Sequence, residues 1–165
     1  MGLRDLASVL PVEHALRVAD SKPELVDWTK ICYTAKLPES FIEKHKNRVD
    51  WHYVSNSQKL SEEFIEKHKD EVDWVAVCEY QKLSEEFIDR HRDRVVWSRV
   101  SKYQKLSPSF IDKHADRVDW MLVSKYQELP ESLIEKYKDR VNWYYVSMYQ
   151  KLSEEFIERH RNFVD

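Results

Sequence analysis

Residues 74–96 read WVAVCEYQKLSEEFIDRHRDRVV, and residues 97–119 read WSRVSKYQKLSPSFIDKHADRVD. The second stretch repeats the first at the same length, and the pattern continues on both sides of this pair. The six tryptophans of the chain stand 23 residues apart without insertion or deletion, at positions 28, 51, 74, 97, 120 and 143. A fixed short period is typical of proteins in which each unit is held by its neighbours. We therefore predict six tandem repeats over residues 28–165.

Each repeat carries two signals for the start of a helix. A Ser such as Ser61 is followed by acidic residues and by Phe-Ile, which is the order expected of an N-cap and a first helical turn. Asp73, directly before a Trp, is a second N-cap. We expect an A-type helix from about Ser61 to Lys69 and a B-type helix from about Asp73 to Gln81, with equivalents in the other repeats. Helices this short are marginal alone in water, so they must pack on one another.

The predicted fold is therefore all-α, an α-solenoid of six two-helix repeats of 23 residues. The stretch from Leu10 to Asp27 is similar to the A-type half of a repeat and is about four residues longer. We predict that residues 1–27 form an N-terminal helical cap and that residues 28–165 form a single solenoid domain.

The segments from Gln58 to Trp74 and from Gln81 to Trp97 share the pattern Q-K-L-S-E-E-F-I-E/D-K/R-H-x-D-x-V. This pattern resembles tandem helical repeats in uncharacterised proteins of bacteriophages and large DNA viruses. The resemblance covers Trp28 to Asp165, nearly the whole chain. It implies a viral or virus-derived protein, and it implies nothing about chemistry.

The composition excludes several classes of function. A single glycine rules out the Gly-rich phosphate loops of nucleotide enzymes, and a balance of 27 basic against 30 acidic residues argues against a strongly basic nucleic-acid binder. The two cysteines favour a reducing compartment, and no apolar run approaches the length of a membrane span. We find no catalytic constellation, so we expect no enzymatic activity, no cofactor, no membrane contact and a cytoplasmic location, in the host cell if the protein is viral.

Comparison of the six repeats separates two faces of the B-type helix. The residues three, four and seven positions after Trp vary little and are predicted to pack, whereas those one, two and five positions after Trp differ in almost every repeat and are predicted to point outward. We interpret the outward positions as a partner-binding strip; neutral drift, or packing against a neighbouring repeat, is the competing explanation. The candidate binding residues are Tyr53, Val75, Arg99, Lys102, Met121, Leu122, Lys125, Tyr144, Tyr145 and Met148.

Three functions remain open from the sequence. The favoured one is a scaffold for a protein or peptide partner, with the region from Met121 to Met148 as its hot spot. The alternative is a modular reader of single-stranded RNA, which the variable positions suit and the charge disfavours. The third is end-to-end self-association through Phe163 and Val164.

The remaining recurrent residues have structural interpretations. A histidine recurs at positions 45, 68, 91, 114 and 160, and Tyr137 replaces it in the fifth repeat. We expect these histidines on the buried side of the A-type helices, with hydrogen bonds between adjacent repeats. A shared metal ion is not expected, because equivalent residues lie too far apart. Trp and the tyrosines at 80, 103, 126 and 149 are expected to pack. Cys32 and Cys78 are expected to be small buried residues, too distant from each other for a disulfide.

Overall fold

The computed structural model describes residues 12–163, which contain thirteen α-helices, one 3₁₀ helix and no strand. From Trp28 onward, B-type and A-type helices alternate as the sequence predicts. The chain begins with α1 (Val12–Ser21) and the 3₁₀ helix η2 (Pro23–Leu25). The B-type helices each begin at a tryptophan: α2 (Trp28–Thr34), α4 (Trp51–Ser57), α6 (Trp74–Tyr80), α8 (Trp97–Tyr103), α10 (Trp120–Tyr126) and α12 (Trp143–Tyr149). The A-type helices are α3 (Glu39–Lys44), α5 (Glu62–Lys67), α7 (Glu85–Arg90), α9 (Pro108–Lys113), α11 (Glu131–Lys136) and α13 (Glu154–Arg159).

The helices start where the sequence predicts, because the predicted side chains cap them. The Ser61 hydroxyl accepts a hydrogen bond from the backbone N–H of Phe64, and three other serines cap their A-type helices in the same way: Ser84, Ser107 and Ser153. The carboxylate of Asp73 accepts from two N–H groups in the first turn of α6. At the start of α8 the cap position holds Val96, which offers no side-chain acceptor.

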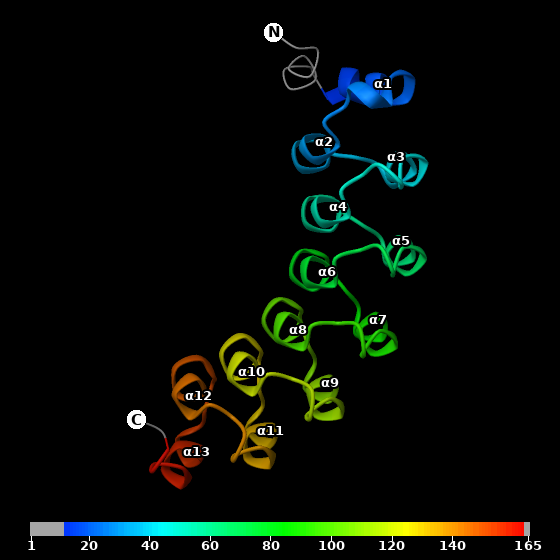
Figure 1. The fold of residues 1–165 in the computed structure, drawn as a ribbon. Helices are drawn as coiled ribbons and strands as arrows, with labels where there is room; N and C mark the ends of the chain where they lie inside the picture. Colours follow the sequence, from blue (N-terminus) through cyan, green and yellow to red (C-terminus); the bar gives the residue numbers. More distant parts are fainter. Residues whose placement is uncertain (1–11, 164–165) are drawn as a thin grey trace. The chain divides into compact units, whose positions relative to one another are not determined.

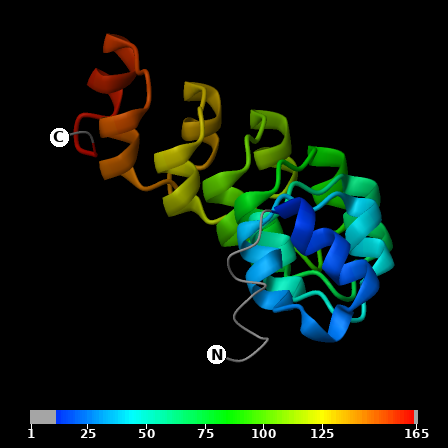
Figure 2. The same ribbon diagram turned by 90° about the horizontal axis from the view of Figure 1, so that it is seen from above.

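The chain divides into two compact units, an N-terminal unit that ends at Gln81 and a C-terminal unit that begins at Lys82. In the N-terminal unit α2, α4 and α6 pack in order as one row, and α3 and α5 form a second row (Figure 1). In the C-terminal unit α8, α10 and α12 form the B-type row, which Figure 2 shows from above. Each unit is a short α-solenoid, which confirms the predicted fold class. A single solenoid domain over residues 28–165 stays a prediction.

The core of each unit consists of the positions that vary little among the repeats. In α4, Val54 and Ser55 are completely buried, and the Phe-Ile pair of α5, Phe64 and Ile65, is buried in the same unit. Burial of a side chain such as Ile or Val contributes about 1.5–3 kcal/mol. Contributions of this size stabilise helices of six or seven residues that would not persist alone.

Helix α1 stands where an A-type helix would precede α2. Its Asp20 lies 23 residues before Glu43 and accepts from Lys44 and His45, as Glu43 accepts from the next repeat. Helix α1 has ten residues where α3 has six, so the extra length expected from the sequence lies at the start of the helix. The start of the predicted cap, residues 1–11, lies outside the described residues.

Within residues 12–163 no helix is long and apolar enough to cross a membrane. The ten residues of α1 correspond to about 15 Å of helix, against a hydrocarbon core of about 30 Å.

Candidate functional site

Within each unit, a glutamine at the end of a B-type helix joins that helix to the B-type helix before it. Gln127, at the end of α10, accepts from the N–H of Leu106 at 3.0 Å through Oε1 and donates to the carbonyls of Ser101 and Gln104 at 2.9 and 2.8 Å through Nε2. Three other glutamines make the same bonds, to residues 21, 26 and 23 positions earlier: Gln58, Gln81 and Gln150. In the first repeat the position holds Ala35. These glutamines are therefore structural.

The Ser and Trp of the B-type helices also serve packing. The hydroxyl of Ser124 donates to the carbonyl of Trp120 at 2.6 Å and accepts from the N–H of Asn142, the cap residue of the next B-type helix, at 3.0 Å. The indole N–H of Trp120 donates to the carbonyl of Ala115 at 2.9 Å, and all six tryptophans bond a carbonyl five residues earlier. The carbonyls after a helix lack intrahelical partners, so the indole completes the end of each A-type segment. The predicted packing role of Trp is confirmed.

On the A-type helices the recurrent His faces an acid of the preceding repeat. His68, only 2% exposed, places Nε2 at 2.7 Å from Oε2 of Glu43, and its ring lies tilted against that of Trp51 with centroids 4.8 Å apart. Tyr137 keeps this contact in the fifth repeat, because its hydroxyl donates to Asp112 at 2.7 Å. The predicted contact between adjacent repeats is confirmed, and three further His–acid pairs lie within 3.0 Å: His45–Asp20, His114–Asp89 and His160–Glu135.

The same carboxylates hold a lysine from the following repeat. Lys67 lies 2.9 Å from Glu43, and hydrogen bonds from Lys67 and His68 lower the pKa of Glu43 to about 2. Equivalent pairs are Lys44–Asp20, Lys113–Asp89 and Lys136–Asp112. Much of the charge on the A-type helices is therefore neutralised by ion pairs between adjacent repeats at the protein surface. In the part of the chain that the structure describes, no group of three or more His, Cys, Asp or Glu side chains is arranged to hold a metal ion.

The candidate binding residues divide by exposure. None of them is buried: four are exposed (Val75, Met121, Tyr144 and Met148), and six are half-buried (Tyr53, Arg99, Lys102, Leu122, Lys125 and Tyr145). The position two residues after Trp faces the preceding B-type helix. The ring of Tyr53 in α4, for example, lies against that of Tyr33 in α2 with centroids 5.7 Å apart. At this position of α6, Ala76 is 3% exposed, so the expectation that the position always points outward is wrong there.

The tyrosines six residues after Trp are exposed, so the expectation that they pack like Trp is wrong. Their exposed fractions range from 39% to 55% across Tyr80, Tyr103, Tyr126 and Tyr149. On a helical wheel the position falls about 240° from Trp, at the edge of the buried face, and the rings leave the surface there.

In the C-terminal unit these tyrosines alternate with lysines of the strip. The ammonium of Lys102 lies 4.6 Å from the ring centroid of Tyr103 and 5.6 Å from that of Tyr126 in the next repeat. Lys125 lies 5.2 Å from Tyr126 and 5.1 Å from Tyr145. All four distances are within the range of about 6 Å for cation–π contacts. We call these five residues the Tyr–Lys ladder; two further rings continue it, Tyr144 and Tyr149, at 5.4 and 6.1 Å from Tyr145.

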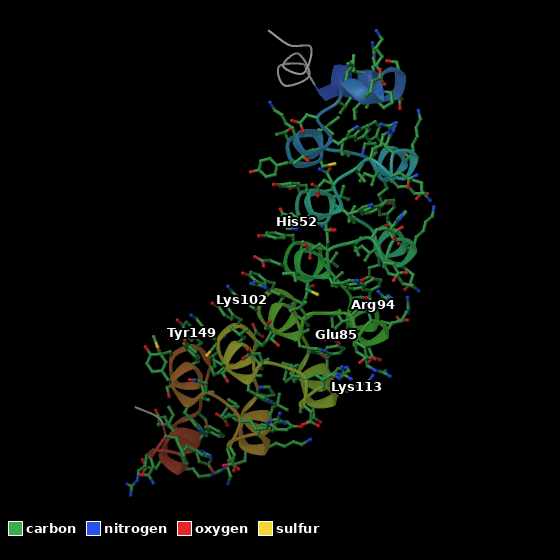
Figure 3. All side chains as sticks on the ribbon, viewed as in Figure 1. His52, Glu85, Arg94, Lys102, Lys113 and Tyr149 are labelled. Carbon is green, nitrogen blue, oxygen red and sulfur yellow. The ribbon has the colours of Figure 1, made fainter. Side chains whose placement is uncertain are left out.

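The ladder lies on the free side of the B-type row. Figure 3 shows Lys102 and Tyr149 on that side of the C-terminal unit and Lys113 on the side of the A-type helices. The equivalent face of the N-terminal unit differs in chemistry. The residues five positions after Trp are Tyr33, Asn56 and Glu79, so no lysine stands between rings at these positions.

The other sequence predictions concern single residues. Cys32 and Cys78 are buried and form no disulfide with each other, as expected. Phe163 is 56% exposed and stacks on Trp143 at 5.1 Å between centroids; Val164 lies outside the described residues, and self-association stays a prediction.

Sequence reasoning missed the contribution of Tyr103, Tyr126 and Tyr149 to the exposed face. A signal was present, because Lys-Tyr pairs occur at residues 102–103 and 125–126.

No family model, curated protein or solved structure matches the chain.

Proposed function

We propose that this protein is a non-enzymatic scaffold that binds a protein or peptide partner through the B-type row of the C-terminal unit. The observation that carries the proposal is the Tyr–Lys ladder, flanked by the exposed side chains of Met121 and Met148. Tyrosine and methionine are enriched at protein interfaces, where they supply large contact areas. Exposed apolar side chains on one face of a protein favour contact with a partner.

The charge of this face indicates the chemistry of the partner. The residues one, two and five positions after Trp in α8, α10 and α12 include three basic residues (Arg99, Lys102 and Lys125) and no acidic residue. The complementary partner is an acidic segment with aromatic or aliphatic anchors. The resemblance to phage and large DNA virus repeats favours a cytoplasmic protein of the host cell.

Single-stranded RNA is the second candidate, because bases stack on tyrosine rings and phosphates pair with lysines. Such a reader needs a basic residue at the same position of each repeat. The position five residues after Trp holds Asn56 and Glu79 in the N-terminal unit and Met148 in the last repeat. The position eight residues after Trp, which is Lys in the other five repeats, holds Glu128 in the fifth. This irregularity favours the peptide partner.

The experiment is selection of random displayed peptides on the immobilised full chain. Affinities of the enriched peptides are then measured for the wild type and for Tyr144→Ala/Tyr145→Ala. We expect the double substitution to weaken binding by about 30-fold or more, the cost of removing a hot spot. Unchanged far-UV circular dichroism establishes that the variant is folded, since neither side chain is buried.

Tyr33→Ala is the matched control, because Tyr33 is 63% exposed against 68% for Tyr144 and lies in the other unit. It should leave the affinity unchanged. Failure to enrich any peptide, or equal binding by the double variant, would contradict the proposal. Preferential binding of labelled oligouridine that weakens steeply between about 50 and 200 mM salt would instead establish the RNA alternative.

A further inference from the structure

A groove runs beside the Tyr–Lys ladder on the C-terminal unit, where the B-type helices give way to the loops that follow them. It consists of two adjoining cavities of about 640 and 460 Å³. Tyr103 and Tyr126 line the first cavity and Tyr149 lines the second, while Pro108 and Glu128 line both. The shared residues make the two cavities neighbours along one groove that crosses three repeats.

The floor of this groove is apolar in its centre because a polar link is missing there. In the flanking repeats the first acid of an A-type helix accepts from the next cap residue: Glu85 from the N–H of Ser107, and Glu131 from the N–H of Ser153 at 2.5 Å. In the repeat between them these two positions hold Pro108 and Pro130, which supply neither the acceptor nor the donor. Both prolines are exposed and line the second cavity.

The spacing of the groove matches one type of extended backbone. Tyr103, Tyr126 and Tyr149 recur once per repeat on helices that pack side by side, and packed helices lie about 8–10 Å apart. A polyproline II helix rises about 3.1 Å per residue with three residues per turn, so one turn advances about 9.3 Å. Every third residue of such a ligand meets the same position of successive repeats. A β-strand, whose side chains repeat after two residues and about 6.8 Å, does not keep this register.

The loop side of the groove carries alternating charge. Lys105 and Glu128 line the first cavity and Lys151 lines the second, all three are exposed, and no other described side chain pairs with them. Five of the six repeats hold Lys at this position, so Glu128 is the exception and lies between two lysines. The complementary ligand carries an acidic, a basic and an acidic residue at intervals of three.

We propose that this groove binds a proline-rich segment of the partner in the polyproline II conformation, with the pattern acidic-x-x-basic-x-x-acidic. The inference rests on the proposed function and identifies the class of ligand. Tyrosine rings and proline surfaces form the grooves that such helices occupy, and a preformed ligand loses little entropy on binding. The charges at Lys105, Glu128 and Lys151 then fix the register of the segment.

The test measures fluorescence anisotropy of labelled peptides with the full chain at low salt. We expect EPPRPPE to bind at least about tenfold more tightly than the charge-reversed RPPEPPR, and also more tightly than the flexible EGSRGSE. Tyr126→Ala should abolish the preference for EPPRPPE over the flexible EGSRGSE, because the tyrosine ring contacts the polyproline II backbone. The decisive variant is Glu128→Lys, which installs the residue of the other five repeats and so leaves folding intact. It should shift the preference from EPPRPPE to EPPEPPE.

The groove assignment would be overturned by equal binding of EPPRPPE and RPPEPPR, or by an unchanged peptide preference in Glu128→Lys. Tighter binding of oligouridine than of any peptide would overturn it as well. The two proposals fail in distinguishable ways. Selected peptides that lack proline and depend on Tyr144 and Tyr145 but not on Tyr126 would refute the groove and leave the scaffold standing. Absence of binding by every selected and designed peptide would refute both.

Discussion

Replacement of Gln127 by alanine tests whether the buried glutamines hold neighbouring repeats together. The substitution removes three hydrogen bonds, to the N–H of Leu106 and to the carbonyls of Ser101 and Gln104. Gln127 is 7% exposed and Leu106 is 5% exposed, so water does not readily replace the lost partner. A buried donor left unsatisfied costs about 1–3 kcal/mol, and each lost bond to a carbonyl costs about 1 kcal/mol. We expect the free energy of unfolding to fall by about 3–5 kcal/mol.

Two measurements check this estimate. Urea unfolding, followed by circular dichroism, gives the total loss. Hydrogen exchange of the Leu106 amide gives the local part, which should accelerate by about 10- to 100-fold because each 1.4 kcal/mol corresponds to a factor of ten. Gln127→Met fills the same volume without hydrogen bonds and should lose nearly as much stability, which separates the bonds from a cavity effect.

The neighbouring exposed residue supplies the surface control. Glu128→Ala should change the free energy of unfolding by less than about 0.5 kcal/mol. Equal stability of Gln127→Ala and Glu128→Ala, with the Leu106 amide still protected from exchange, would refute the role assigned to the glutamine.

Three further predictions concern stability. Val96→Asp supplies the cap that α8 lacks, and it should raise the free energy of unfolding by about 1 kcal/mol in urea titration, whereas no gain would mean that the capping geometry is wrong. Tyr137→Phe removes the bond to Asp112 and should lower the unfolding midpoint, while Tyr137→His should retain it; equal losses in both variants would show that the contact contributes nothing. Burial lowers the pKa of His114 below its ordinary 6.5, so the unfolded chain takes up the proton first and stability should fall as the pH drops below about 6.5. The lowered pKa of Glu43, about 2 against 4.5, adds a second loss between about pH 4.5 and 2, and an unchanged melting temperature from pH 7.5 to 5.5 would contradict the first step.

The fold was predictable because its signals are local. Cap residues such as Ser61 and Asp73 act on N–H groups two or three residues away, so the sequence alone places the start of each helix. The buried face of the B-type helix followed from internal comparison, since Val54 and Gln58 hold positions that vary little.

The exceptions within the repeat depend on contacts between repeats, which the sequence does not display. Tyr137 interrupts the histidine series, yet its hydroxyl donates to the acid of the preceding repeat as the imidazoles contact theirs.

The candidate site was predicted in part for a similar reason. The wheel identified the strip that contains Lys102 and Lys125, but it treats one helix at a time. The contact of Lys102 with Tyr126 joins the fifth position after one Trp to the sixth position after the next. Such a pairing depends on how far adjacent helices are displaced, and only the structure gives that displacement.

The glutamine bonds described above reach back 21, 23 or 26 residues and no further. Each of these four glutamines thus bonds to backbone groups of the preceding B-type helix and its loop, which are present whatever side chains that repeat carries. Unequal crossing-over in the gene, if it adds or deletes one 69-nucleotide segment, would join equivalent partners and leave each bond intact. The length of such a protein can therefore change by whole 23-residue repeats during evolution. Insertion or deletion of one codon inside a loop would instead break the glutamine hydrogen bonds at that repeat.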